Sequence, residues 1–305
     1  MTLTGWTTGI VATVALAVSV SASARDVSLE YEGLTLSGRY APGPPGAPVV
    51  LMVHGTLAHA DMEIMSAFRD VFAEEGWGAL AVSLSLGDSQ RTGMYPCDAP
   101  HRHRSADAGP EAAAWLGWLK AQGEGPVVLL GQSRGALQMA EFAAGGSLPG
   151  VDAMVLVAPP LAKPGSTAAA YERRYGTSLA TQLEKARARA ESGAPGDLID
   201  VPGFLHCEEA RVSAESFLSY YGEHAPADLA GLILRSPVPV LVIAGSEDEI
   251  SPGLPRAIRA SANPLVEVRE IDGADHFFRD LYAYDVVEQV QAFVAGLPSA
   301  ESAPP

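Results

Sequence analysis

Short apolar runs alternate with helical patterns along most of this chain, and that alternation limits the folds it can adopt. The apolar runs are typical of strands buried on both faces of a sheet, and they lie at 47–54, 78–86, 125–131, 151–159, 238–245 and 265–271. Helical patterns follow or separate these runs at 61–75, 106–121, 133–144, 254–262 and 284–295. This order predicts an α/β fold, a doubly wound and mainly parallel sheet with helices on both faces.

Two segments depart from the alternation. Residues 27–42 alternate apolar and polar side chains around Glu32-Gly33, which predicts an antiparallel hairpin at one edge of the sheet. Residues 161–235 contain helix-favouring and aromatic stretches but no clear strand, so we expect a helical cap inserted over one end of the sheet. We therefore interpret residues 25–298 as one domain and residues 299–305 as a flexible tail.

The charge balance excludes several classes of partner. The chain has 36 acidic and 20 basic residues among 305, a formal net charge of −16. A surface of this sign repels phosphate backbones and anionic lipid headgroups, so we expect no nucleic acid partner.

The first 24 residues have the pattern of a signal peptide. No charged side chain precedes Arg25, the apolar segment 10–20 is too short to span a bilayer comfortably, and Ala22-Ser23-Ala24 matches the small-residue cleavage pattern. We expect an exported protein, periplasmic or secreted, that starts at Arg25 and has no stable membrane association after cleavage. An uncleaved anchor or a buried N-terminal helix remains the alternative, since the usual Lys or Arg is missing.

The chain has two cysteines, Cys97 and Cys207. In an oxidising compartment such a pair can form a disulfide, and export favours that interpretation. Two buried, independent thiols are the alternative, because the sequence does not show that the two residues are close.

Candidate catalytic residues follow the carboxyl ends of the predicted strands. Ligands bind at these ends in parallel α/β sheets. Ser133 lies in "GQSRG", directly between a strand and a helix, and the flanking glycines leave room for a sharp turn with the serine exposed at its apex. A serine hydroxyl becomes a nucleophile when an imidazole acts as its base and a carboxylate orients that imidazole. Asp248 and His276 follow later strands in the order Ser, Asp, His.

Four motifs in order, "HGT", "GQSRG", "GSEDEISP" and "DGADHFF", resemble those of the α/β-hydrolases over nearly all of the sequence after residue 24. The resemblance implies that Ser133 is the nucleophile, His276 the base and Asp248 the acid, with Asp275 as the alternative acid. It also implies an oxyanion hole formed by the backbone N–H groups of Thr56 and Arg134.

The resemblance therefore implies a serine hydrolase that cleaves an ester or a related acyl bond of a small molecule through an acyl-enzyme, with no cofactor. A thioesterase, amidase or peptidase would share these motifs. A binding protein with the same fold and no turnover is the alternative from another class. His54 is expected to brace its loop by hydrogen bonding.

Two further features bear on the cap. His101 and His103 lie two residues apart, which would supply half of a metal site, but Arg102 and Arg104 oppose a cation and favour a solvated or substrate-facing loop. Six aromatic residues of the insertion are expected either to line an acyl or aromatic pocket or to form a helix core: Tyr171, Tyr175, Phe204, Phe217, Tyr220 and Tyr221.

Overall fold

A computed structural model of the chain describes residues 23–146, 148–161, 165–223, 225, 228–260 and 263–298. The signal peptide predicted over 1–24 lies outside these residues apart from Ser23 and Ala24, and so does the tail predicted at 299–305. Within the ranges described, the structure has no helix with the length and apolar character needed to cross a membrane.

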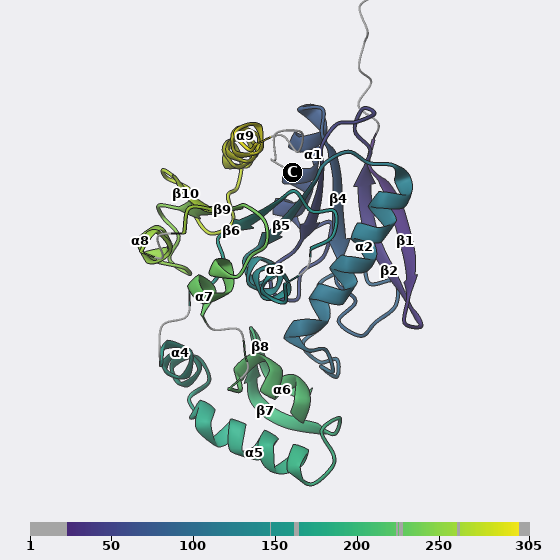
Figure 1. Cartoon of the computed structure of the whole chain (residues 1–305). Helices are drawn as coiled ribbons and strands as arrows, with labels where there is room; N and C mark the ends of the chain where they lie inside the picture. Colours follow the sequence, from purple (N-terminus) through teal and green to yellow (C-terminus); the bar gives the residue numbers. More distant parts are fainter. Residues whose placement is uncertain are drawn as a thin grey trace, which may run out of the picture.

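An eight-stranded sheet in the order β1-β2-β4-β3-β5-β6-β9-β10 organises the fold (Figure 1). Its strands are β1 Arg25–Tyr31, β2 Leu34–Ala41, β3 Val49–Val53, β4 Gly78–Ser83, β5 Val127–Gln132, β6 Ala153–Val157, β9 Val240–Gly245 and β10 Val266–Ile271. The six strands from β4 to β10 run parallel, while β1 and β2 form an antiparallel hairpin at one edge. The structure thus confirms the predicted sheet and its edge hairpin.

Helices cover both faces of the sheet (Figure 1). They are α1 Glu63–Glu74, α2 Ala108–Gln122, α3 Arg134–Ala144, α7 Leu229–Leu234, α8 Leu254–Arg259 and α9 Tyr282–Ala295. Successive side chains of a strand point to opposite faces, so that Leu51 packs into the core with α2 and α3 whereas Met52 packs into the core with α1 and α9. Every residue of β3 is buried, as the apolar run predicted.

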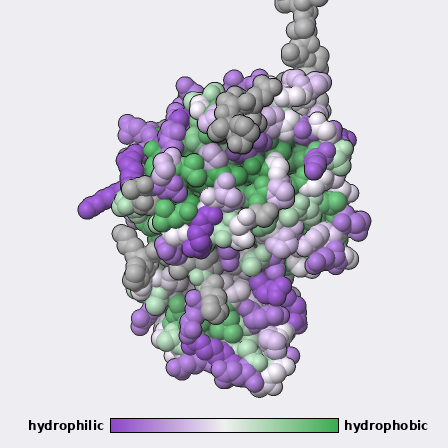
Figure 2. Space-filling view, viewed as in Figure 1, coloured by the Kyte–Doolittle hydropathy of each residue, from purple (hydrophilic) through white to green (hydrophobic). Residues whose placement is uncertain are grey.

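The insertion forms a cap of three helices and a hairpin, which lies beyond α3 and α7 in Figure 1. Its elements are α4 Ser166–Tyr175, α5 Leu179–Glu191, β7 Leu198–Phe204, β8 Cys207–Ser213 and α6 Ala214–Tyr221. The edge of the cap over α5 is mostly hydrophilic (Figure 2). After the cap, the chain returns to the body at α7, which packs against α3.

The expectation that the insertion contains no strand was wrong, because β7 and β8 pair as an antiparallel hairpin. Pro202 and Gly203 interrupt the alternation of β7, and both residues are unfavourable in strands. The turn at Leu205-His206 also lacks the glycine or asparagine that usually marks a hairpin, although Leu205 has a φ of 60°.

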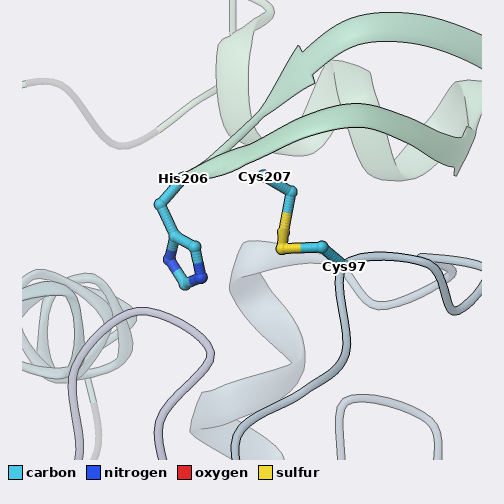
Figure 3. Close-up of side chains that lie close together, drawn as sticks. All are labelled: Cys97, His206 and Cys207. Carbon is cyan, nitrogen blue, oxygen red and sulfur yellow. A yellow bond between two sulfur atoms is a disulfide. The ribbon is translucent and has the colours of Figure 1, made fainter.

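The cap is fastened to the loop that follows β4. A disulfide joins Cys97 of this loop to Cys207 of β8, with Cα atoms 5.3 Å apart (Figure 3). The same loop adds to the cap hairpin through His101, whose N–H donates to Arg211 O at 2.8 Å and whose carbonyl accepts from Ser213 N at 2.8 Å. The cap is therefore attached to this loop both covalently and by backbone hydrogen bonds.

Candidate active site

The turn between β5 and α3 holds Ser133 in a strained conformation, with φ 52° and ψ −120°. A Cβ atom on Gly131 would lie 2.5 Å from the Cα of Ala136, and one on Gly135 would lie 2.4 Å from the carbonyl oxygen of His54. Neither position has room for a side chain. The two glycines are therefore required by the close approach of neighbouring backbone, as predicted for a sharp strand-to-helix turn with Ser133 at its apex.

Ser133, His276 and Asp248 form a continuous chain of hydrogen bonds. Ser133 Oγ lies 2.9 Å from His276 Nε2, and Asp248 Oδ2 lies 2.9 Å from His276 Nδ1. Nδ1–H therefore donates to the carboxylate, and Nε2 is left to accept the serine proton. The side chains come from three strand ends, since Ser133 follows β5, Asp248 follows β9 and His276 follows β10.

Backbone groups hold the other carboxylate oxygen of Asp248. Its Oδ1 accepts hydrogen bonds from the N–H groups of Ile250 and Ser251 at 2.8 and 2.9 Å. Burial acts to raise the pKa of this carboxyl, but the hydrogen bonds from His276, Ser251 and Ile250 outweigh it and hold the pKa below its usual value. Asp248 is therefore ionised and oriented toward the imidazole.

The alternative acid, Asp275, does not face the imidazole of His276. Its carboxylate accepts from the N–H of Phe277 at 2.8 Å and lies 3.4 Å from Arg279. The other acidic neighbours in the motif, Glu247 and Glu249, are exposed. The geometry thus places Asp248, and not its neighbours, against the histidine.

Thr56 and Arg134, the two predicted oxyanion-hole residues, lie together beside Ser133. Arg134 begins α3, so its N–H has no acceptor within the helix. Its side-chain Nε donates to Thr56 Oγ1 at 3.1 Å. A Cβ atom on Gly55 would lie 3.2 Å from Ser133 Cβ, which shows how closely the loop after β3 passes the serine.

His54 is buried and fixes this loop. Its Nδ1–H donates to the carbonyl of Gly55 at 2.8 Å, while its Nε2 accepts from Leu84 N at 3.0 Å and from Arg91 Nη2 at 2.9 Å. Burial and the charge of Arg91 lower the pKa of His54 to about 3. The imidazole is therefore neutral and ties the ends of β3 and β4 together, in agreement with the bracing role expected from the sequence.

His101 and His103 are buried, which corrects the expectation of a solvated or substrate-facing loop. His101 Nδ1 lies 3.2 Å from His103 Nε2, and His103 Nδ1 lies 2.9 Å from the hydroxyl of Tyr220. The correction follows from the pairing of this loop with β8, which covers both imidazoles with the cap. Nδ1 of His101 and both nitrogens of His103 have these partners, so the pair is part of the junction between cap and body.

Cys97, His206 and Cys207 bring metal-ligating atom types within 4.8 Å of one another (Figure 3). A cysteine binds a metal through its thiolate, and here the two sulfurs are bonded to each other. In this oxidised state the group fastens the cap and offers one imidazole.

A pocket of about 590 Å³, here called the cap pocket, lies between the cap and the body, at Arg134, the residue after Ser133. On the body side it is lined by Arg134 and by Ile250, which lies two residues after Asp248. Three of the aromatic residues considered above, Tyr171, Tyr175 and Tyr221, line its cap side. The other three are buried in the core of the cap, Phe217 and Tyr220 on α6 and Phe204 at the end of β7. The volume falls within the range of small-molecule sites.

Comparison with solved structures shows the same fold in several proteins of low sequence identity. Est1E from Butyrivibrio proteoclasticus is 15% identical, with a TM-score of 0.61 over 88% of this chain and 97% of that one. A second structure of Est1E, with ferulic acid bound, has a TM-score of 0.63 at 16% identity over 88% of this chain and 98% of that one. The esterase Pf2001 from Pyrococcus furiosus is 16% identical, with a TM-score of 0.58 over 90% of each chain.

No curated protein sequence matches this chain. Residues 50–290 match the profile that describes the alpha/beta hydrolase family. This match extends from β3 to α9 and includes Ser133, Asp248 and His276. The chain therefore belongs to the alpha/beta hydrolase family.

Proposed function

We propose that this protein is a serine hydrolase that cleaves a carboxylic ester of a small molecule through an acyl-enzyme. The observation that carries the proposal is the hydrogen-bonded chain from Ser133 through His276 to Asp248, with the serine at a strained turn between strand and helix. An elbow with both hydrogen bonds formed has the geometry that nucleophilic catalysis needs.

In the proposed mechanism, Ser133 Oγ attacks the ester carbonyl carbon while His276 Nε2 takes the hydroxyl proton. The carbonyl oxygen becomes an oxyanion, which the N–H groups of Arg134 and Thr56 stabilise. The imidazolium then gives its proton to the departing alcohol oxygen as the carbon–oxygen bond breaks. Water attacks the acyl-enzyme by the same route and releases the acid. Asp248 holds the imidazole in the required tautomer and stabilises its charged form.

An ester is favoured over a thioester or an amide because Pf2001, which shares the fold, is an esterase. The ferulic acid held by Est1E supports a small organic substrate. A binding protein without turnover has no need for a nucleophile, base and acid within hydrogen-bonding distance, so we place that alternative second.

Labelling with a fluorophosphonate probe and hydrolysis of 4-nitrophenyl esters test the proposal. We expect Ser133→Ala to lose both the label and nearly all esterase activity while its thermal unfolding is unchanged. Ser192→Ala is a matched control, because Ser192 lies at the exposed end of α5 and its hydroxyl binds only local backbone. Retention of full activity by Ser133→Ala would overturn the mechanism, and an unlabelled, inactive wild type would favour the binding protein.

We also propose that the protein is exported and begins at Arg25 after cleavage. The proposal is supported by the apolar segment and cleavage pattern before Arg25, and by the Cys97–Cys207 disulfide, which is typical of oxidising compartments. Mass spectrometry of protein recovered from the periplasm or medium of its host tests it. A chain that retains residues 1–24 in the cytoplasm would contradict it.

A further inference from the structure

The cap pocket concentrates positive charge in an acidic protein. Three arginines line it, Arg134, Arg173 and Arg174, against one acidic residue, Glu249. The chain as a whole has 36 acidic residues and only 20 basic ones, so composition alone predicts the opposite balance. A local excess of guanidinium groups favours a ligand of negative charge.

Arg134 approaches the pocket from the body, one residue after Ser133. The side chain is half-buried, with Nε bound to Thr56 Oγ1 and with its guanidinium 5.5 Å from the centre of the Tyr220 ring. Among the described residues, no carboxylate forms an ion pair with it. A partly desolvated cation with free N–H donors is stabilised when a bound anion pairs with it.

Arg174 approaches the same pocket from the cap. One of its nitrogens, Nη2, donates to the carbonyl of His206 at 2.9 Å, and its guanidinium lies 5.5 Å from the centre of the Tyr175 ring. The side chain is therefore held at the rim by the hairpin turn and by an aromatic ring. Like Arg134, it forms no ion pair with a carboxylate of the described residues.

The hydroxyls of the three tyrosines of the pocket form hydrogen bonds with backbone groups of the cap hairpin. Tyr171 Oη donates to Gly203 O and Tyr175 Oη donates to Leu205 O, both at 2.8 Å, while Tyr221 Oη accepts from Leu205 N at 2.8 Å. The rings also contact one another, with 4.7 Å between the centres of Tyr171 and Tyr175. Tyr175 and Tyr221, which are half-buried, therefore offer rigid ring surfaces to a ligand, with the buried Tyr171 packed behind them, and such surfaces suit a flat aromatic group.

We propose that the cap pocket selects aromatic esters that carry a second, ionised carboxylate. In this assignment Arg134 and Arg174 bind the carboxylate from opposite sides of the pocket, and the tyrosine rings contact the aromatic group. The inference rests on the proposed serine hydrolase function, because it assigns the substrate class of the same site.

Two substrate pairs that differ in one charge test this assignment. In the first pair, 4-nitrophenyl 4-carboxybenzoate is compared with its neutral 4-carbamoyl analogue, so that the charge is on the acyl side. In the second, 4-carboxyphenyl acetate is compared with 4-carbamoylphenyl acetate, so that the charge is on the alcohol side. We expect kcat/KM to favour the charged member of at least one pair by about tenfold to a hundredfold, as a charge-assisted hydrogen bond would give.

Arginine variants test whether the preference for the charged ester arises in the cap pocket. Arg174→Gln and Arg134→Gln should each lower the ratio of charged to neutral kcat/KM by about tenfold, mainly through a higher KM for the charged ester. Arg187→Gln removes the same charge from α5 of the cap but outside the pocket, and should leave the ratio and the neutral-ester activity unchanged. An equal fall in Arg187→Gln would mean that only overall charge matters, and would overturn the proposal.

Failure of this inference can be told apart from failure of the proposed function. If the wild type takes the probe and cleaves the neutral esters, but favours neither charged ester, the hydrolase stands and the assigned substrate class is wrong. Calorimetric binding of 1,4-benzenedicarboxylate to Ser133→Ala needs no turnover. We expect saturable binding that Arg174→Gln weakens by about tenfold and that benzene-1,4-dicarboxamide does not reproduce. No binding of the dicarboxylate, or equal binding of the neutral diamide, would overturn the inference.

Discussion

The carboxylate of Asp248 and the imidazole of His276 lie 2.9 Å apart although 28 positions separate them in the sequence. The two residues follow neighbouring parallel strands, β9 and β10, whose carboxyl ends meet at one edge of the sheet. Asp275, the immediate neighbour of His276, instead binds the backbone of Phe277. Position in the sheet, rather than position in the sequence, therefore decides which acid contacts the histidine.

Replacing each aspartate by asparagine tests which of Asp248 and Asp275 acts with His276. We expect Asp248→Asn to lower kcat by about 10⁴, because the amide favours the wrong imidazole tautomer and cannot stabilise the imidazolium. Asp275→Asn is the matched control and should lower kcat less than about tenfold, since its side chain contacts only its own loop. Steady-state kinetics on a 4-nitrophenyl ester measures both, and a crippled Asp275→Asn with a mild Asp248→Asn would reverse the assignment.

Removal of the disulfide should destabilise the protein. Cys97 and Cys207 are 110 positions apart, and closing a loop of this length stabilises by about 4–5 kcal/mol in the chain-entropy model. We expect the double variant Cys97→Ser/Cys207→Ser to lose a large part of this in urea unfolding, with no further effect of dithiothreitol. In the wild type the reductant should reproduce the loss. Two free thiols per unfolded, unreduced chain would show that the bond is absent.

Stability should fall in acid because of His54. Its pKa is lowered to about 3 in the folded chain, against about 6.5 in the unfolded one, so below pH 6.5 the unfolded state binds more protons. The free energy of unfolding therefore has its full value above about pH 6.5 and falls toward pH 3, by up to about 1.4 kcal/mol for each pH unit.

Denaturant unfolding between pH 7 and pH 4 measures this slope. His54→Gln keeps an acceptor for Leu84 N. It should reduce the slope of unfolding free energy against pH by up to about 1.4 kcal/mol per pH unit, the value for one proton. His59→Gln should flatten the slope less, because burial lowers the pKa of His59 at a half-buried position, whereas His54 is fully buried. An unchanged slope in His54→Gln would show that the imidazole titrates normally in the folded protein.

The close contact at Gly135 predicts a large steric penalty. In Gly135→Ala the new methyl group would meet the carbonyl oxygens of His54 and Val53 at 2.4 and 2.5 Å. We expect a loss of about 3 kcal/mol or more in stability, together with loss of activity, because β3 is held between two strands and cannot yield. Gly117→Ala, in the exposed interior of α2 with open space around it, should instead gain about 0.5–1 kcal/mol. Thermal unfolding compares the two variants.

The body of this fold could be predicted from the sequence for a physical reason. Strands buried on both faces need continuous apolar runs, and such runs as the one in β3 are unambiguous when helical patterns separate them. The elbow at Ser133 was equally visible, because the flanking glycines are required by backbone contacts. The catalytic roles of Ser133, His276 and Asp248 stay predictions until the variants are measured.

The cap was harder to predict, because its structure depends on contacts between distant segments. The hairpin of β7 and β8 has Pro202 inside a strand and Leu205 at its turn, so local signals were weak. The burial of His101 arises from pairing with β8, more than 100 positions later. Arg134 and Arg174 line one pocket because of the way the cap docks on the body. No periodic pattern in a single sequence predicts that docking.

The disulfide and the backbone hydrogen bonds that attach the cap to the loop after β4 restrain the cap against opening. A cap that hinged open at each turnover would have to break the pairing of His101 with β8 and would still be tethered by the disulfide. We therefore expect the width of the pocket entrance to stay nearly constant while the disulfide is intact. In the proposed hydrolase, the shape of a molecule, rather than the timing of a moving lid, would then decide whether it is admitted.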